Sequence, residues 1–426
     1  MSGHTGTANP APAAAGGAAR GFHSAWGLAQ HGLALGATSP NLTGGASPAS
    51  RGVMCSNAAM RYALIIAGGS GTRLWPMSTK QMPKQLVPFI GGRSLLQIAL
   101  DRLRGLLPDE QVYVCAGESM RDPILRALPG FDADRFLAEP EGRDTLNAVA
   151  LGSAVLGRDD PDAVVAVFTA DHLIEPVEDF QKIVDQGFRI AEARERSLVT
   201  FGIAPTHAAT GYGYLQLGKP LEITAEHHAF VVSRFREKPD LHTAQQYLHA
   251  GPNRYLWNSG MFVWRAATLL DCVRRFAPEN HAGLMDIVEA WDTPRHDAVL
   301  RAVYPTLKKI SVDYAVMEPA SQDASLTVAA VPMPLRWLDV GAWPSFMQTL
   351  DPDEQGNAAA GARSVHIDTG NTLVVSDDPE HLVATIGCDD LIVIRTAKAT
   401  LICKTNQAER IKELHAQLTR DHPDVV

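Results

Sequence analysis

The chain has 426 residues, of which 46% are hydrophobic and 20% charged, so its length and composition fit a folded protein of two or three domains. A net charge of -9 excludes a broad nucleic-acid surface, which requires clustered Lys and Arg, but it permits a small phosphate bound by a few local cations. No apolar run reaches about 18 residues, which excludes a predicted transmembrane helix, and five scattered cysteines without a Cys-x-x-Cys pair favour reduced thiols in the cytoplasm.

Residues 1–59 differ in composition from the rest of the chain. They are rich in Ala, Gly, Ser, Thr and Pro and show no sustained hydrophobic period, so they contain too little apolar surface to form a core. The segment also lacks the basic start and compact apolar stretch of a signal peptide. We predict a disordered extension, and a translation start misplaced upstream of Met54 or Met60 explains the composition equally well.

Residues 61–355 show the alternation of strands and helices that is typical of an α/β domain. Short apolar runs predict buried parallel strands, and an amphipathic stretch between the first two predicts a helix. Such a pattern implies a mostly parallel sheet flanked by helices, which binds ligands beyond the carboxyl ends of its strands. The predicted strands are Tyr62–Ala67, Val112–Cys115, Val164–Phe168 and Leu198–Ile203, and the helix spans Ser94–Leu106.

Residues 356–426 follow a different pattern of short β-like runs spaced eight to ten residues apart, with Gly, Asp and Asn between them. A small meander and a few coils of β-helix both produce this spacing. A closing helix is predicted from Gln407 to Thr419, with Ile411, Leu414 and Leu418 on one face. No chemistry clusters here, so the region is interpreted as a structural or assembly module. Its predicted strands are Ser364–Ile367, Thr372–Val375, Leu382–Ile386, Leu391–Ile394 and Thr400–Cys403.

The strongest chemical signal is the glycine-rich segment Gly68-Gly69-Ser70-Gly71-Thr72-Arg73-Leu74, which directly follows the first strand and precedes Pro83-Lys84-Gln85. Glycines let the backbone approach a ligand closely, and turned N–H groups form an anion-binding concavity. Arg73 and Lys84 add the two cations that a triphosphate requires. The segment is neither a P-loop nor a Gly-x-Gly-x-x-Gly motif.

These residues resemble the signature of nucleotide-sugar pyrophosphorylases, specifically the mannose-1-phosphate guanylyltransferases. The resemblance covers residues 61–350 and implies the Rossmann-like, glycosyltransferase-A-type nucleotidyltransferase fold, with a short C-terminal β-helix that often makes dimer contacts. Further segments recur in the order typical of the family. They are Glu139-Pro140 with Arg143-Asp144-Thr145, Thr169-Ala170-Asp171-His172, Thr210-Gly211-Tyr212-Gly213-Tyr214, Glu237-Lys238-Pro239, Trp257-Asn258-Ser259-Gly260-Met261-Phe262, Ser311 to Glu318, and Trp337-Leu338-Asp339-Val340-Gly341.

Two aspartates, Asp171 and Asp339, are implied as ligands of a Mg²⁺ cofactor. Asp171 follows a predicted strand and Asp339 lies in a predicted turn, and either alone is typical of a helix cap or a turn. Two carboxylates distant in sequence can nevertheless converge on Mg²⁺, which prefers oxygen ligands and substrate phosphates.

The resemblance also implies which residues bind the nucleotide and the sugar phosphate. Besides Gly68, Gly69, Gly71 and Thr72 of the glycine-rich segment, the guanine side consists of Glu139, Arg143 and Asp144. A carboxylate at Glu139 accepts from the N1 and N2 donors of guanine, a pattern that adenine lacks. Asp144 stands where the family usually has Asn, which leaves the base preference open. The sugar-phosphate side consists of Gly213, Glu237, Lys238 and Asn258.

The implied reaction joins mannose 1-phosphate to GTP by in-line attack on the α-phosphorus, and Arg73 and Lys84 are the predicted catalytic residues. Three alternatives remain: a sister enzyme that uses glucose 1-phosphate with UTP or dTTP, a regulatory subunit without catalysis, and a bifunctional isomerase. All four of the expected catalytic and metal residues are present, which argues against the second. Residues after 355 contain no His/Glu cluster, which argues against the third. A homodimer is a further expectation.

Overall fold

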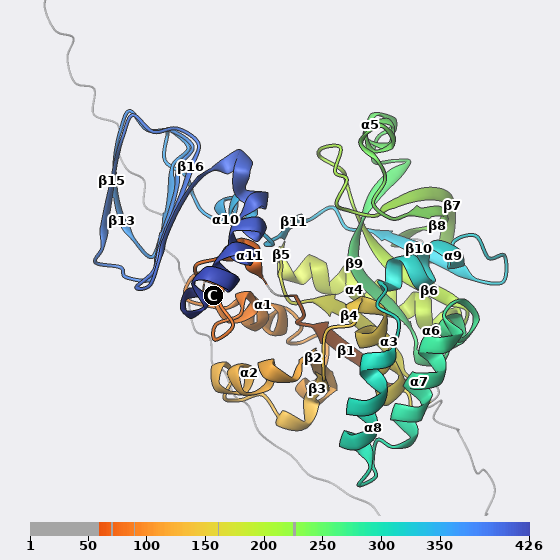
Figure 1. Ribbon diagram of the computed structural model, residues 1–426. Helices are drawn as coiled ribbons and strands as arrows, with labels where there is room; N and C mark the ends of the chain where they lie inside the picture. Colours follow the sequence, from red (N-terminus) through yellow and green to blue (C-terminus); the bar gives the residue numbers. More distant parts are fainter. Residues whose placement is uncertain (1–58, 70, 89, 161, 225–226) are drawn as a thin grey trace, which may run out of the picture. The chain divides into compact units, whose positions relative to one another are not determined.

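The computed structural model describes residues 59–426 apart from 70, 89, 161 and 225–226, so the extension predicted at 1–59 lies outside the described residues except for its last position. Its central feature is a nine-stranded sheet (Figure 1). In spatial order the strands are β3 (Phe136–Glu139), β2 (Val112–Gly117), β1 (Arg61–Ile66), β4 (Val164–Thr169), β9 (Tyr255–Arg265), β6 (Ser197–Ile203), β10 (Thr327–Pro332), β8 (His227–Arg236) and β7 (Tyr214–Thr224).

Most strands of this sheet point the same way. The pairs β3–β2, β2–β1, β1–β4 and β6–β10 are parallel. β9 is antiparallel to β4, β6 and β7, while β8 is antiparallel to β10 and β7, so these two strands run against the other seven. The predicted mostly parallel sheet and its four predicted strands are therefore confirmed. The antiparallel β9 inserts between β4 and β6, which sequence spacing did not reveal.

Helices cover both faces of the sheet, as predicted. On one face α4 (Val177–Ala193) places Phe180, Val184 and Phe188 at i, i+4 and i+8, and all three are buried against the strands. Burial of each such side chain stabilises the fold by about 1.5–3 kcal/mol. The opposite face packs against α3 (Asp144–Leu156), α6 (Ala266–Phe276), α7 (Pro278–Glu289) and α8 (His296–Val303). Other helices of this part are α2 (Arg121–Ala127), α5 (Leu241–Ala250), α9 (Glu318–Ala320) and α10 (Trp343–Met347).

The helix predicted at Ser94–Leu106 is shorter than expected. Ser94 is its N-cap, and the helix α1 spans Leu95–Asp101. The next residue, Arg102, is only 2% exposed and donates from Nη1 to the carbonyl of His172 at 2.9 Å. Gly105 then adopts a φ of +86°, which is incompatible with a continuing helix. The apolar periodicity beyond Asp101 therefore reflects buried turns rather than helix.

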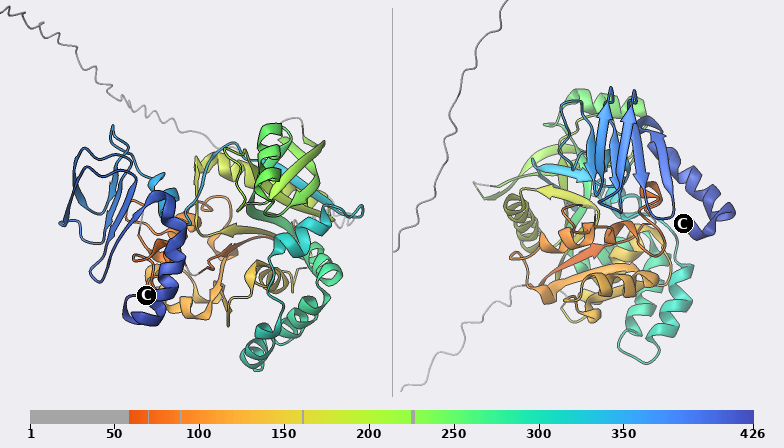
Figure 2. Two further views of the ribbon diagram at one scale, coloured as in Figure 1. Left: turned by 45° about the horizontal axis from the view of Figure 1, so that its top comes forward. Right: turned by 90° about the vertical axis from the view of Figure 1, so that its left-hand side faces the viewer.

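The C-terminal region is a β-helix (Figure 2). Strands β12 (Ala358–Ala360), β14 (Leu373–Ser376) and β16 (Leu391–Arg395) pair in parallel, and β13 (Arg363–Ile367) pairs in parallel with β15 (Leu382–Ile386) on a second sheet. Each strand thus pairs with the strand two positions along the chain, whereas a meander would pair consecutive strands. The coils of β-helix are confirmed, and only β17 (Thr400–Lys404) closes the first sheet in an antiparallel sense.

The closing helix begins later than predicted. A 3₁₀ segment, η8 (Thr405–Arg410), precedes α11 (Ile411–Asp421). Ile411 is buried, and Leu414 and Leu418 pack on the same core, as their spacing predicted. This core also includes Leu74 and Trp75, so it joins the β-helix to the glycine-rich segment. Across the part of the chain that is described, every helix is too short or too polar to cross a bilayer.

Candidate active site

The predicted nucleotide-binding and metal-binding segments meet at one edge of the sheet. β1 ends at Ile66 and β4 at Thr169, which are register partners, so Gly68 and Asp171 leave the sheet side by side. Glu139 is the last residue of β3 at the same edge. This is the carboxyl edge of the parallel strands, where sheets of this type bind their ligands.

The glycine-rich segment wraps around the second predicted motif. Gly71 has a φ of +61°, and a Cβ there would lie 2.7 Å from both Lys84 Cβ and Ser78 Oγ, so only glycine fits this position. Gln85 donates from Nε2 to the carbonyl of Gly68 at 2.5 Å. The two motifs therefore form one folded loop. Its other predicted ligand-binding residues are Gly69, with a φ of +92°, and Thr72, which begins the 3₁₀ turn η1 (Thr72–Leu74).

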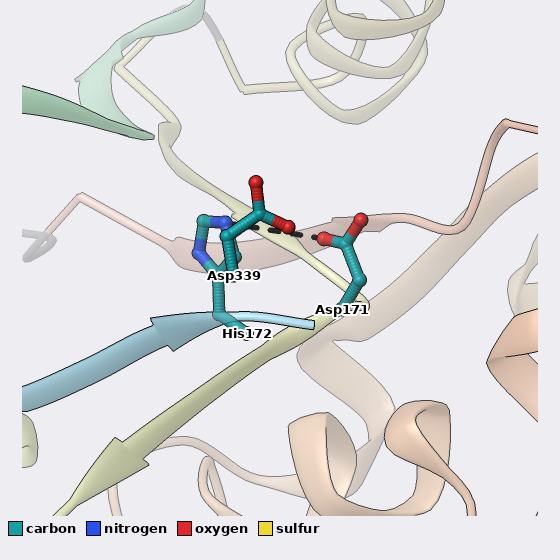
Figure 3. Close-up of side chains that lie close together, drawn as sticks. All are labelled: Asp171, His172 and Asp339. Carbon is teal, nitrogen blue, oxygen red and sulfur yellow. Dashed lines mark ion pairs between the residues drawn. The ribbon is translucent and has the colours of Figure 1, made fainter. Parts of the chain in front are cut away.

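Asp171 and Asp339 lie together, with His172 beside them (Figure 3). The small antiparallel pair β5 (His172–Glu175) and β11 (Arg336–Asp339) sets Asp339 opposite His172, so Asp339 ends a strand rather than lying in the predicted turn. One ligand atom from each of the three residues lies within 4.8 Å of the others. Lys84 donates from Nζ to Asp171 Oδ2 at 2.6 Å. This arrangement brings a predicted catalytic residue into direct contact with a predicted metal ligand.

The electrostatics of this cluster suit a divalent cation. Burial, together with the nearby Asp171 carboxylate, raises the pKa of Asp339 to about 6. Burial also favours the neutral form of Asp171, but the Lys84 ammonium outweighs it and lowers the pKa of that carboxyl. The pair therefore carries negative charge that Lys84 only partly balances. Two hard oxygen donors with uncompensated charge fit a Mg²⁺-like ion.

His172 contributes an uncharged ring to the cluster. Burial lowers its pKa to about 4, and its Nδ1 accepts a hydrogen bond from Trp337 Nε1 at 3.3 Å. Its backbone carbonyl holds the buried Arg102. These contacts give His172 a structural role beside Asp171.

Arg73, the other predicted catalytic residue, contacts the C-terminal region. Its Nη1 donates to both carboxylate oxygens of Glu409, at 3.0 and 3.1 Å. A Cβ built on Gly341 would lie 3.1 Å from Asp339 Oδ1 and 3.5 Å from Arg73 Nη2, so both groups border the same narrow space. Arg73 therefore stands between the predicted metal-binding carboxylates and a residue of η8.

The segment predicted to bind the base connects β3 to α3. Glu139 is 5% exposed, and its Oε1 accepts from the hydroxyl of Tyr304 at 2.6 Å. Burial raises the pKa of the Glu139 carboxyl. Arg143 forms an ion pair with Glu141, and Asp144 begins α3 with a φ of +65°. In this structure the Glu139 carboxylate faces inward, where it accepts from the Tyr304 hydroxyl and from the backbone N–H of Arg143.

The four residues predicted for the sugar phosphate lie together. Lys238 donates from Nζ to Glu237 Oε1 at 2.7 Å, and a Cβ at Gly213 would lie 2.5 Å from Glu237 Oε2. The carbonyl of Gly213 accepts from the backbone N–H of Asn258 at 2.8 Å. Asn258 donates from Nδ2 to Asp313 Oδ1 at 2.8 Å. These contacts connect all four predicted residues and add a fifth, Asp313.

Asp313 and Glu409 contact predicted site residues, Asn258 and Arg73, and sequence reasoning did not single them out. Asp313 lies inside the family-like segment Ser311–Glu318, and that placement was the signal available. Burial, together with the nearby Glu237 carboxylate, raises the pKa of Asp313 to about 7. Glu409 lies in a polar stretch of a different module, and nothing in the sequence connects it with Arg73.

Comparison with known proteins agrees with this fold. A family model described as nucleotidyl transferase matches residues 62–356, and a second, described as a MannoseP isomerase/GMP-like beta-helix domain, matches residues 362–418. Enzymes of the first family generally use a divalent metal ion.

Individual relatives cover most of the chain. A mannose-1-phosphate guanylyltransferase of Klebsiella pneumoniae is 36% identical over 83% of this chain and 73% of its own length. The xanthan biosynthesis protein XanB of Xanthomonas campestris pv. campestris is 35% identical over 83% of this chain and 72% of its own length. A crystal structure from Thermus thermophilus, described as a mannose-1-phosphate geranyltransferase, superposes with a TM-score of 0.73 at 32% identity, covering 84% of this chain and 99% of that one.

Proposed function

The chain belongs to the nucleotidyl transferase family, among the mannose-1-phosphate guanylyltransferases, and we propose that it joins mannose 1-phosphate to GTP to form GDP-mannose and pyrophosphate. The observation that carries this proposal is the cluster of Lys84, Asp171 and Asp339 beside the glycine-rich loop at the carboxyl edge of the sheet. A binding site for a nucleoside triphosphate needs backbone N–H donors, a cationic side chain and a metal site close together. This edge of the sheet offers all three.

Mg²⁺ is the metal that we propose, and Asp171 and Asp339 would hold it. The donor set fits, because both residues supply carboxylate oxygens and His172 is neutral. Such an ion, when bound, supplies charge neutralisation for phosphate oxygens. Lys84 already contacts Asp171 at 2.6 Å, so a phosphate beside that carboxylate would also meet the ammonium.

The chemistry that remains for the protein is positioning and charge stabilisation. An oxygen of mannose 1-phosphate attacks the α-phosphorus of GTP, and the bond between the α-phosphorus and its bridging oxygen to the β-phosphate breaks. The bridging oxygen leaves with the pyrophosphate and carries the developing negative charge. Arg73 and Lys84 would stabilise that charge, so both would act more on turnover than on sugar affinity.

Recognition of the two substrates is assigned to opposite parts of the site. We assign the nucleotide to Gly68, Gly69, Gly71 and Thr72, with guanine at Glu139, Arg143 and Asp144. The sugar phosphate would bind at Gly213, Glu237, Lys238 and Asn258. The contacts of Glu237 with Lys238, and of Asn258 with Asp313, support a rigid polar subsite for hexose hydroxyls.

The same proposal includes the domain bounds, the oligomeric state and the compartment of the protein. Residues 61–355 would form the nucleotidyltransferase domain and residues 356–426 the β-helix module. We propose a homodimer in the cytoplasm. The outer face of β13 and β15 supports the dimer, because Val365, Ile367, Leu382 and Ile386 are 49–70% exposed there.

The test is pyrophosphate release from purified protein with mannose 1-phosphate, Mg²⁺ and each nucleoside triphosphate in separate reactions. We expect release with GTP and almost none with Asp339→Asn, whereas substitution of an exposed acid such as Asp286→Asn should leave the rate unchanged. Release with UTP or dTTP instead would keep the mechanism and overturn the assignment of Glu139 and Arg143. If no nucleotide gives pyrophosphate release, with either mannose 1-phosphate or glucose 1-phosphate, the proposed activity is overturned.

A further inference from the structure

The C-terminal segment lies directly against the glycine-rich loop. Leu74 and Trp75 of this loop share a core with Ile411 and Val426. Trp75 donates from Nε1 to the carbonyl of Val425 at 2.8 Å. Because Trp75 follows Arg73 by two residues, the backbone that carries Arg73 is fixed from the C-terminal side.

One side chain extends this contact to the chemistry. Glu409 accepts from Arg73 Nη1 through both carboxylate oxygens, at 3.0 and 3.1 Å. Arg73 also carries N–H groups on Nε and Nη2, and no described residue is seen to accept from them. Nη2 borders the same space as Asp339, as the positions around Gly341 demonstrate. Glu409 therefore binds one end of the guanidinium and leaves the end nearer the metal-binding carboxylates open.

This ion pair contributes little to folding. The side chains of Arg73 and Glu409 are 43% and 74% exposed, and exposed pairs are weakened by water and by the entropy of long side chains. Its effect is on orientation. Without Glu409, Arg73 keeps the Asp339 carboxylate as a neighbour, because both border the space at Gly341. A guanidinium that pairs with Asp339 would no longer face a phosphate.

We propose that Glu409 is a positioning residue that acts through Arg73, so that the C-terminal module completes the nucleotide site. This inference rests on the proposed function, because it assumes that Arg73 binds the phosphate chain of the nucleotide. Glu409 holds Nη1 and keeps the remaining N–H donors directed at the leaving pyrophosphate. The β-helix module is thus part of the reaction machinery as well as a structural element.

The experiment compares Glu409→Gln with Glu413→Gln, which removes the same charge one turn later. Glu413 is 69% exposed and pairs with Arg410 at 3.1 Å, so it is matched in exposure and partner type. We expect Glu409→Gln to lower kcat about tenfold while KM for mannose 1-phosphate stays constant. Glu413→Gln should behave as the wild type. Both variants should melt at the wild-type temperature, which separates positioning from folding.

A second arm tests whether the effect passes through Arg73. In an Arg73→Ala background, adding Glu409→Gln should cause no further loss of kcat, because the guanidinium that Glu409 orients is gone. An additive loss, or wild-type kinetics for Glu409→Gln alone, would overturn the proposal while leaving the proposed activity intact.

If the wild type releases no pyrophosphate with any nucleotide, the proposed function fails, and the inference is then judged by binding. Calorimetry with inorganic pyrophosphate and Mg²⁺ should give weaker affinity for Arg73→Ala and Glu409→Gln than for Glu413→Gln. Equal affinity for all three proteins would refute the positioning role.

Discussion

The carboxyl group of Asp313 makes the stability of this protein sensitive to pH. Its pKa is about 7 in the folded protein, against 3.8 for an ordinary aspartate, because it is largely buried and lies near Glu237. Between those values the folded chain keeps a proton that the unfolded chain has lost. The stability that depends on this proton is fully present below about pH 4 and is lost as the pH rises through 7.

The replacement Asp313→Asn removes this dependence while preserving the local hydrogen bond. The new amide oxygen can still accept from Asn258 Nδ2, which now donates to Asp313 Oδ1 at 2.8 Å. A rise of about three pKa units corresponds to about 4 kcal/mol at most. Because Asp313 is partly exposed, screening by water reduces this effect, and we expect about 2 kcal/mol.

The assay is urea unfolding at intervals between pH 5 and pH 8. We expect the variant to gain about 2 kcal/mol in the free energy of unfolding relative to the wild type over this range. Asp286→Asn, at an exposed position, serves as the control and should follow the wild-type curve. Parallel curves for wild type and Asp313→Asn would mean that Asp313 is ionised throughout, and the argument from burial would be refuted.

Other predictions test the rest of the site. Gly71→Ala places a Cβ 2.7 Å from Lys84 Cβ at a φ of +61°, so turnover should fall more than about 100-fold and the melting temperature should drop; unchanged kinetics would show that the loop can relax. Removal of divalent metal by EDTA should abolish turnover, and Asp339→Asn should stay almost inactive at the Mg²⁺ concentrations that restore the wild type; an identical Mg²⁺ titration would remove Asp339 from the metal site. Tyr304→Phe takes away the hydroxyl that donates to Glu139 at 2.6 Å, so the free energy of unfolding in urea should fall by about 1–3 kcal/mol; a neutral result would mean that Glu139 finds another donor.

Local signals predicted most of the secondary structure correctly. The apolar run Val164–Phe168 is a strand because its residues are buried on both faces of the sheet, as composition indicated. The helix predicted at Ser94–Leu106 is longer than the observed α1. The chain leaves the helix where the buried side chain of Arg102 donates a hydrogen bond to the carbonyl of His172. Spacing alone could not distinguish a meander from a β-helix, since the two differ only in which strands pair.

The candidate site was predictable to the extent that its residues lie in recognisable segments. Asp171 and Asp339 were expected together, and the structure places them in one cluster. The contact of Lys84 with Asp171 was not expected, because both had been assigned separate roles. Glu409 lies 336 positions from Arg73 in sequence, and only the packing of α11 and η8 on the loop reveals the contact.

The packing of the C-terminal segment on the Arg73 loop also bears on how such proteins can diverge. Two modules joined only by a linker can be exchanged between genes as independent units. Here Trp75 of the first module donates a hydrogen bond to the carbonyl of Val425 in the second. Arg73 of the first module likewise donates to Glu409 of the second. A chimera that takes its β-helix from a distant homologue would inherit a foreign partner for this arginine, so the two modules should be inherited as a pair.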